Sequence, residues 1–363
     1  MYVVNYANGD VILTAADEPI RRGVYGVAVM GGSTGKSRLD IFESGTEKFI
    51  RSVDAFPGFT GEFYTDTGDI NNDGVGDIIC GSGNGSQNGH VVVFDGERLL
   101  RPIVADPKNY DTSYSAGGSV RASLYAFINY SSGVAVRLAD INGDSFADIV
   151  LAPGTGAGTV TQSHLRVWDG KLSMQQFEKG APFLEYNYKL WELASFYAFG
   201  GNGNPGGGMA ISVIRTQGGD QIVASQLFGP GAKVFQYNGS KELATISDFT
   251  GQLLATGNTI VGLNSPGGER FYISAGTSSS NSGYVYLRNS KGSQVGDPVM
   301  VFGGARGGLR TALQNLDQDS QDEFLVIRDT TAMAEGYDIE FTGSSINLVK
   351  KTQLIRGGAG GWM

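Results

Sequence analysis

The chain has 363 residues with a formal net charge of −9, and 56 of the residues are glycine. The acidic balance disfavours nucleic acid as a partner, because nucleic-acid-binding surfaces are basic. The glycines lack the three-residue period of collagen, and with 40% hydrophobic residues the chain can bury a core.

No apolar run approaches the ~20 residues that a membrane-spanning helix requires, so we expect no membrane insertion. The N-terminal stretch MYVVNYANGDVILTAADEP also lacks the basic and apolar regions of a signal peptide. Either the chain is cytoplasmic, or it is a segment whose export signal is missing.

A repeated unit is clearest between residues 61 and 207. A strand-like run (GEFYTDTG, then GVAVRLA) leads into an acidic loop, and a second run (DIICG, then DIVLAPG) follows it. A glycine-rich loop comes next, then a third strand ending in HVVVFDG or HLRVWDG, and a fourth ending in SLYAF or SFYAF. The same order recurs more weakly before and after this region.

Each unit contains four short strands with strong turn signals and no helical periodicity of useful length. A four-stranded unit of roughly fifty residues matches one blade of a β-propeller, whose faces are buried when blades pack radially. We predict an all-β fold with one six-bladed propeller domain, or seven blades if the N-terminal segment contains another. The predicted blades are about 1–60, 61–132, 133–207, 208–256, 257–308 and 309–363.

The ends of the chain offer a way to close the ring. The last residues, RGGAGGWM, stop where the first strand of another unit would begin. We therefore expect the N-terminal strand, VVNYANGDVILT, to supply that strand.

Two units are longer than the others, with insertions at about 97–118 and 171–191. Both insertions fall between the third and fourth strands, which places them on the same face as the acidic loops. The second contains five aromatic residues that either stack on a ligand or, as we favour, pack over the neighbouring blade: Phe177, Phe183, Tyr186, Tyr188 and Trp191.

The acidic loops have a regular spacing of oxygen-bearing side chains. Asp69 to Asp77 has such side chains at positions 1, 3, 5 and 9, with Gly74 at the bend. Asp140–Asp148 and Asn315–Glu323 repeat the spacing. Oxygen ligands at alternating positions around a sharp bend suit calcium. An EF-hand is excluded, because position 12 is not Glu and the flanks are strands. The alternative is acidic turns without metal, in which Asp and Asn bond the local backbone.

With these loops in phase with the strands, the unit resembles the FG-GAP repeat, also called the integrin α-type or VCBS-like repeat. The resemblance implies a calcium-bearing propeller of bacterial surface or secreted proteins, used for adhesion or ligand binding, with two or three structural ions. It also implies side-chain oxygens at positions 1, 3, 5 and 9 and a carbonyl at position 7. The implied ligands are Asp69, Asn71, Asp73, Val75 and Asp77 in the first loop, Asp140, Asn142, Asp144, Phe146 and Asp148 in the second, and Asn315, Asp317, Asp319, Gln321 and Glu323 in the third.

Two later units have lost the acidic pattern. Alignment puts Val213 at position 1 and Arg215 at position 3 of one loop, and Gly262 at position 1 and Arg270 near position 9 of the other. We predict no calcium in either. The guanidinium groups either replace the ion by bonding loop carbonyls or are simply solvated.

We find no catalytic motif, and His90 and His164 occupy the same place in two units, as a blade feature would. The favoured function is therefore a non-enzymatic calcium-binding module for extracellular adhesion or for binding a protein or glycan ligand. A carbohydrate-binding lectin and a polysaccharide lyase or hydrolase are the alternatives.

Overall fold

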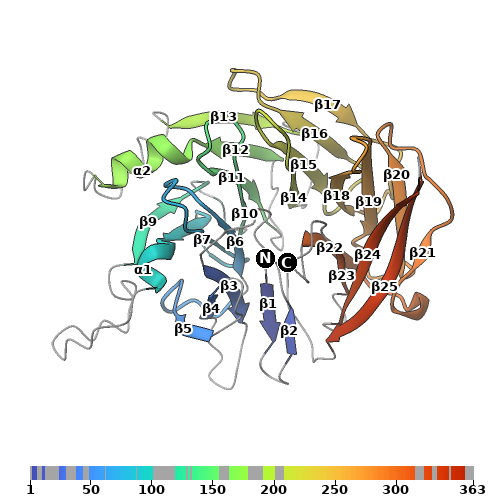
Figure 1. The fold of residues 1–363 in the computed structure, drawn as a ribbon, viewed down its shortest axis with the longest axis horizontal. Coiled ribbons are helices and arrows are strands. Elements are labelled where there is room, and N and C mark those ends of the chain that lie inside the picture. Colours follow the sequence, from blue (N-terminus) through green and yellow to red (C-terminus); the bar gives the residue numbers. More distant parts are fainter. Residues whose placement is uncertain are drawn as a thin grey trace.

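The computed structural model describes residues 2–5, 10–12, 24–29, 38–43, 49–61, 63–86, 88–100, 119–127, 130, 133–154, 163–178, 191–200, 208–314, 323–328, 333–342 and 345–355. Their strands form six sheets, five of four strands and one of five. The sheets are arranged around a common centre (Figure 1). The predicted all-β, six-bladed propeller is confirmed. No helix in these ranges is long and apolar enough to cross a membrane.

The first three sheets follow one another in sequence. The first contains β1 (Tyr2–Asn5), β2 (Asp10–Ile12), β3 (Val24–Val29), β4 (Arg38–Glu43) and β5 (Phe49–Val53). The second contains β6 (Phe63–Gly68), β7 (Asp77–Ser82), β8 (His90–Phe94) and β9 (Val120–Tyr125). The third contains β10 (Val134–Ala139), β11 (Asp148–Pro153), β12 (His164–Trp168) and β13 (Glu192–Tyr197).

The last three sheets continue the pattern. The fourth contains β14 (Met209–Ile214), β15 (Gln221–Gln226), β16 (Ala232–Gln236) and β17 (Ala244–Asp248). The fifth contains β18 (Asn258–Asn264), β19 (Arg270–Gly276), β20 (Tyr284–Asn289) and β21 (Val299–Met300), followed by a 3₁₀ turn at Phe302–Gly304. The sixth contains β22 (Leu309–Gln314), β23 (Glu323–Arg328), β24 (Met333–Thr342) and β25 (Ser345–Ile355).

Burial explains why neighbouring sheets must pack together. Every residue of β7, β11 and β15 is buried, so these second strands are covered on both faces. Outer strand β17 has no fully buried residue. The innermost strands of consecutive sheets touch, from β3 through β6, β10, β14 and β18 to β22. The hydrophobic core therefore lies between blades, as radial packing requires.

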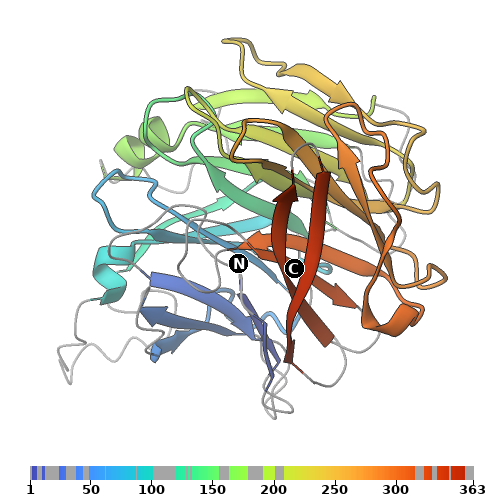
Figure 2. The same ribbon diagram turned by 45° about the vertical axis from the view of Figure 1, so that its right-hand side comes forward.

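The ring closes differently from the sequence expectation, which was wrong. The last sheet has four strands of its own, because the long β24 and β25 complete it. The N-terminal strand β1 instead pairs in parallel with β3 and antiparallel with β2, so both strands extend the first sheet. Strand β2 contacts β25, which brings this edge of the first sheet against the last sheet (Figures 1 and 2).

The sequence patterns did not predict two short helices, α1 (Gly96–Leu100) and α2 (Gly170–Glu178). Each starts directly after a third strand, inside an insertion. Asp95 accepts the Arg98 N–H at 2.8 Å, and Asp169 accepts the Leu172 N–H at 2.7 Å. These carboxylates are N-caps. Helices this short carry little periodic signal, but the shared Asp-Gly ending of the third strands marks both helix starts.

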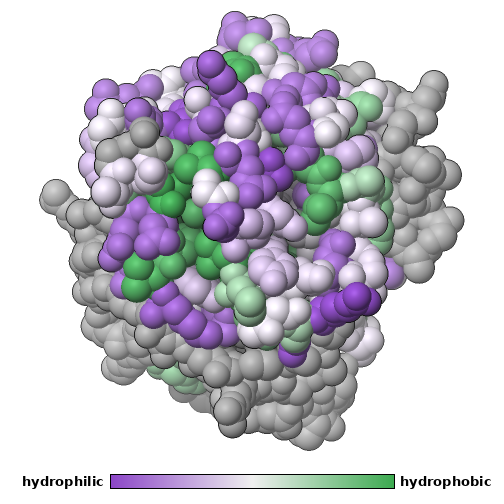
Figure 3. All heavy atoms as spheres, turned by 90° about the vertical axis from the view of Figure 1, so that its right-hand side faces the viewer, coloured by the Kyte–Doolittle hydropathy of each residue, from purple (hydrophilic) through white to green (hydrophobic). Residues whose placement is uncertain are grey.

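The outer surface combines hydrophilic residues with small hydrophobic groups. On the side that lies to the right in Figure 1, hydrophobic residues gather near the centre of the face and hydrophilic ones border them (Figure 3). Among the described residues, large exposed hydrophobics include Phe228 and Met300. Single exposed hydrophobic residues are normal on a soluble surface.

Candidate metal loops

The first acidic loop folds its side chains onto its own backbone. Asp69 accepts the N–H groups of Asp73 and Gly74 at 3.1 and 2.8 Å. Asn71 Oδ1 accepts the Asp73 N–H at 3.0 Å, and Asp73 accepts the Val75 N–H at 2.8 Å. Gly74 has a positive φ of 83°, which glycine adopts without strain. The loop is thus a tight turn in which the side-chain oxygen atoms of alternating residues accept hydrogen bonds from the loop's own backbone N–H groups.

The second loop repeats these bonds position by position. Asp140 accepts the N–H groups of Asp144 and Ser145 at 3.0 and 2.8 Å. Asn142 Oδ1 accepts the Asp144 N–H at 3.0 Å, and Asp144 accepts the Phe146 N–H at 3.1 Å. Ser145 takes the glycine place with a φ of 69°, so the same bend is kept at some conformational cost.

The ninth residue of each loop is buried at the start of a second strand. Asp77 accepts the N–H groups of Ile70 and Gly96 at 3.1 and 2.8 Å. Asp148 accepts those of Ile141 and Gly170 at 2.9 Å each. Burial raises the pKa of both carboxyls to about 8. A cation beside them would favour the charged form and offset this burial cost.

The helix starts press directly against these loops. A Cβ on Gly96 would lie 1.9 Å from the Gly76 carbonyl oxygen, and one on Gly170 would lie 2.0 Å from that of Ala147. Only glycine lets the backbone approach this closely. The described starts of the two insertions, α1 and α2, therefore lie on the same face as the acidic loops, and the rest of each insertion lies outside the described residues.

The donor set fits a hard cation, since the predicted ligands are all oxygen atoms. A carboxylate oxygen that accepts one N–H keeps further lone-pair capacity. Among the described residues, however, no three or more His, Cys, Asp or Glu side chains gather as a metal-binding group. Calcium binding would require the loop carboxylates to converge, and it remains a prediction.

A lysine distinguishes the second loop from the first. Lys171 Nζ lies 3.8 Å from Asp144 Oδ2 and 4.7 Å from the centroid of the Phe146 ring. Both charged groups of this pair are partly exposed, which makes such a pair weak. A divalent cation would compete with the ammonium group for Asp144.

The third loop is only partly within the described ranges. Asn315, Asp317, Asp319 and Gln321 lie outside them. Glu323 begins β23, pairs in register with Gln314 and is buried. It therefore occupies the strand position that Asp77 and Asp148 occupy in the other two loops.

The structure corrects the alignment of the two degenerate loops. Val213 lies within β14 and Gly262 within β18, so neither is the first loop residue. The loop before β15 has six residues, 215–220, against eight, 69–76, in the first acidic loop. Arg270 does begin a second strand, as the alignment placed it.

Arg215 makes the contacts expected of a cation that replaces an ion. Its guanidinium pairs with Asp220 and donates to the Leu138 carbonyl of the preceding blade at 3.3 Å. Asp220 in turn accepts the Asp140 N–H at 3.0 Å. The sequence left open whether this guanidinium bonds loop carbonyls or is solvated. It is bonded, but to the Asp220 carboxylate and to a carbonyl of strand β10 rather than to carbonyls of its own loop.

Replacing this guanidinium should destabilise the blade whether or not calcium is present. We expect Arg215→Met to lower the free energy of unfolding by about 1–2 kcal/mol, because a largely buried carboxylate loses its partner. Denaturant unfolding with calcium and with chelator would measure it. Lys291→Met, which removes an exposed cation from another blade, is the control; a loss for Arg215→Met confined to one condition would contradict the expectation.

Backbone hydrogen bonds join the loops of successive blades. The Ala147 N–H donates to the Asp69 carbonyl at 2.9 Å, and the Asp220 N–H donates to the Asp140 carbonyl at 2.6 Å. In each case the carbonyl of the first loop residue accepts a hydrogen bond from the N–H of the residue that precedes the second strand of the next blade. Local order in one loop is therefore coupled to the next.

The two histidines have equivalent surroundings, as repeat equivalence suggested. His90 Nε2 lies 2.7 Å from Ser123 Oγ, and His164 Nε2 lies 2.8 Å from Ser195 Oγ. A phenylalanine of the preceding blade packs against each ring: Phe56 on His90 and Phe127 on His164. Phe56 follows β5 and Phe127 follows β9, the outermost strands of their sheets, and this packing explains the recurring aromatic corners.

Burial lowers the pKa of His90 and His164 to about 4. The unfolded chain, with imidazole pKa values near 6.5, then binds more protons between about pH 6.5 and 4. We therefore expect stability to fall as pH decreases through that window, and less steeply in a His90→Gln/His164→Gln variant. NMR titration of the imidazole signals checks the cause, and midpoints near pH 6.5 would contradict it.

The predicted aromatic insertion is described only at its ends. Phe183, Tyr186 and Tyr188 lie outside the described residues, and Phe177 belongs to α2. Trp191 is buried within the core formed by the second to fourth sheets. For this tryptophan the packing interpretation is confirmed.

Comparisons with known proteins identify no family. No protein-family model matches the chain, and no curated protein sequence does. Among solved structures, the exotype rhamnogalacturonan lyase YesX matches with a TM-score of 0.43 and 13% identity, over 89% of this chain and 52% of that one. This chain therefore spans about half the length of the lyase.

Two other solved structures are similarly distant. A candidate 6-phosphogluconolactonase from Bacteroides fragilis NCTC 9343 matches with a TM-score of 0.46 and 11% identity, over 90% of this chain and 93% of that one. Dihydro-heme d1 dehydrogenase NirN, in complex with DHE, matches with a TM-score of 0.43 and 12% identity, over 94% and 64%. These likenesses are too distant to bear on activity.

Proposed function

We propose that this chain is a calcium-binding β-propeller of the FG-GAP or integrin α type, serving as a non-enzymatic binding module outside the cell. The observation that carries the proposal is the repeated loop geometry. Asp69 and Asp140 each accept hydrogen bonds from the backbone N–H groups at positions 5 and 6 of their loops. Asp77 and Asp148 each accept one from the first residue of the helix that follows, α1 for Asp77 and α2 for Asp148. Acidic turns that arose independently would not share this whole set of bonds.

The proposed ions are structural. Each of the first two loops joins the first and second strands of a blade, and the carbonyl of its first residue accepts a hydrogen bond from the next blade. An ion held there would fix both the hairpin and the contact between blades. It would also neutralise a buried carboxylate at the start of the second strand, which supports a role in stability rather than in chemistry.

Calcium titration by isothermal calorimetry tests this function. We expect two or three sites with dissociation constants of roughly 10⁻⁴ M, the range of extracellular calcium modules. Asp69→Asn/Asp140→Asn should remove two of them, whereas Asp297→Asn, an exposed carboxylate on the fifth blade, should remove none. Absence of any calcium heat, or equal stoichiometry in the two variants, would refute the assignment.

A second candidate, a lectin, is favoured by two exposed tyrosines. Tyr125 and Tyr197 are 38% and 44% exposed and lie over His90 and His164, with ring centroids 5.3 and 5.1 Å apart. They occupy the same place in adjacent blades, at the end of the strands opposite the helix starts. Exposed aromatic faces at repeated positions could stack on successive sugar rings.

A glycan array separates the two functions. If the chain is a lectin, it should bind an oligosaccharide, and Tyr125→Ala/Tyr197→Ala should lose that binding while retaining calcium. Phe228→Ala, which removes an exposed aromatic from the fourth blade, is the matched control. Absence of glycan binding with calcium binding intact would leave a protein ligand as the partner to seek.

A further inference from the structure

The turn before β15, residues 215–220 of the fourth blade, packs directly against the second acidic loop. A Cβ on Gly219 would lie 2.7 Å from the Ile141 carbonyl oxygen, and one on Gly143 would lie 2.9 Å from the Gly218 carbonyl oxygen. Both contacts are with backbone atoms, and only glycine allows backbones to approach this closely. The turn of the fourth blade therefore forms a wall of the loop of the third blade.

This close approach explains a difference between the two acidic loops. Position 4 is Asn72 in the first loop and Gly143 in the second, and the φ angles are 55° and 77°. Asparagine tolerates a positive φ better than most residues, so the bend alone does not require glycine. Gly143 is required because the turn of the fourth blade lies against it.

Asp220 holds both backbone groups of the first residue of the second loop. Its Oδ2 accepts the Asp140 N–H at 3.0 Å, and its own N–H donates to the Asp140 carbonyl at 2.6 Å. The Asp220 carboxylate is itself buried and fixed, because it pairs with Arg215 and accepts the Thr216 N–H at 3.1 Å. Asp140 is therefore held by a rigid group of the neighbouring blade.

The first loop has the backbone bond without the carboxylate. Ala147 precedes β11 as Asp220 precedes β15, and its N–H donates to the Asp69 carbonyl at 2.9 Å. A methyl side chain, however, cannot accept the Asp69 N–H. Since the two loops share their internal hydrogen bonds, the Asp220 carboxylate is a difference between them that a neighbouring blade supplies.

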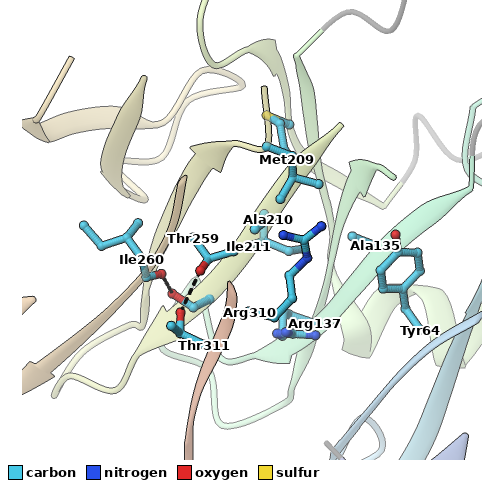
Figure 4. Close-up of a pocket in the computed structure, with 12 residues that line it drawn as sticks. Tyr64, Ala135, Arg137, Met209, Ala210, Ile211, Thr259, Ile260, Arg310 and Thr311 are labelled. Carbon is cyan, nitrogen blue, oxygen red and sulfur yellow. Dashed lines mark hydrogen bonds between the residues drawn. The ribbon is translucent and has the colours of Figure 1, made fainter. Parts of the chain in front are cut away.

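The contacts between later blades at the centre of the ring are of another kind. Thr311 Oγ1 of the sixth blade donates to Thr259 Oγ1 of the fifth at 3.1 Å (Figure 4). Ser212 Oγ of the fourth blade donates to the Ile260 carbonyl of the fifth at 3.0 Å. These bonds join strand residues that line a central cavity, whereas the Asp220 carboxylate bonds a loop residue that is a predicted calcium ligand.

We propose that the Asp220 carboxylate positions Asp140 and thereby sets the affinity of the second loop for calcium. The inference rests on the proposed calcium function, in which Asp140 is the ligand at position 1. A ligand whose backbone is already fixed loses less freedom when the ion binds. Removing a group that orients a metal ligand from outside typically weakens metal binding by about 10–100-fold. The fourth blade thus supports the site of the third blade, although its own loop lacks the acidic spacing.

Calcium calorimetry on Asp220→Ala tests the inference, because alanine is the residue at the matching place in the preceding blade. In an Asp69→Asn background, which keeps the second loop, we expect Asp220→Ala to weaken calcium binding by about tenfold. In an Asp140→Asn background, which keeps the first loop, it should change nothing. A site in the third loop contributes equally to both backgrounds.

Two further variants separate positioning from a general loss of structure. Asp220→Asn keeps an oxygen that can accept the Asp140 N–H and should retain part of the affinity. Asp248→Ala removes a carboxylate that pairs with Lys233 elsewhere in the same blade, and as the matched control it should leave calcium binding unchanged in both backgrounds.

Hydrogen exchange of the Asp140 amide, measured by NMR without calcium, tests the positioning itself. We expect Asp220→Ala to speed this exchange by about tenfold or more, since the amide loses its acceptor. Circular dichroism establishes that the variant is folded. If it is not, Gly143→Asn replaces it in both measurements, because asparagine keeps the bend while its Cβ displaces the turn at Gly218.

The outcomes distinguish this inference from the function on which it rests. If no calcium binds the wild-type chain, the proposed function and the inference are both wrong. If calcium binds, but Asp220→Ala matches Asp248→Ala in the Asp69→Asn background, only the inference is overturned. Unchanged exchange of the Asp140 amide in Asp220→Ala would overturn it as well.

Discussion

Removal of calcium should lower the melting temperature of this propeller by roughly 7 °C relative to about 10 mM calcium. A site filled to 100 times its dissociation constant contributes about 2.7 kcal/mol, and two such sites contribute about 5 kcal/mol. Because the unfolding entropy grows with chain length, each kcal/mol shifts the midpoint of a chain of 363 residues by about 1.3 °C. Without an ion, Asp77 and Asp148 remain buried beside other carboxylates, which is why the effect is large. Differential scanning calorimetry with calcium and with chelator measures it.

Variants assign the calcium effect to particular loops. Asp69→Asn and Asp140→Asn keep the size of the side chain and reduce the charge at position 1. Each should remove about half of the calcium-dependent shift, and the pair should remove most of it. Asp297→Asn should keep the full shift. An unchanged melting temperature in chelator would show that the loops are acidic turns closed by their own backbone.

The period of the sequence made the propeller predictable. Four short strands and an acidic loop recur in phase, and a single four-stranded sheet cannot bury both of its faces. The loop residues were also predictable, because the oxygen spacing of Asp69–Asp77 is repeated at Asp140–Asp148. Their shared hydrogen bonds show that local sequence dictates the local turn.

What was missed depends on contacts between distant parts of the chain. The parallel pairing of β1 with β3 cannot be read from strand patterns, since the same strand could complete either end sheet. Asp220 stands at the place that Ala147 has in the preceding unit, so the repeat does not indicate that its carboxylate holds the Asp140 N–H. The shorter loop at 215–220 shifted the alignment of Arg215, because a repeat template assumes constant loop length.

The start of α2 packs closely on the second acidic loop, and we therefore expect a second large loss of stability in the variant Gly170→Ala. The added Cβ would lie 2.0 Å from the Ala147 carbonyl oxygen and 2.9 Å from its carbon. These are backbone atoms, so relief requires separating α2 from the second loop. That movement would break the 2.9 Å bond from the Gly170 N–H to Asp148 and leave a buried carboxylate with fewer donors.

We therefore expect Gly170→Ala to lower the free energy of unfolding by about 3 kcal/mol or more, through overpacking and a lost buried hydrogen bond. It should also weaken calcium binding at the second loop while leaving the first unaffected. Gly267→Ala is the matched control, because its Cβ would meet only Ser265 Oγ at 3.7 Å. Denaturant unfolding and calcium calorimetry on both variants decide the matter. Equal stability of the two would mean that the helix start moves freely, and the coupling of α2 to the loop would then be wrong.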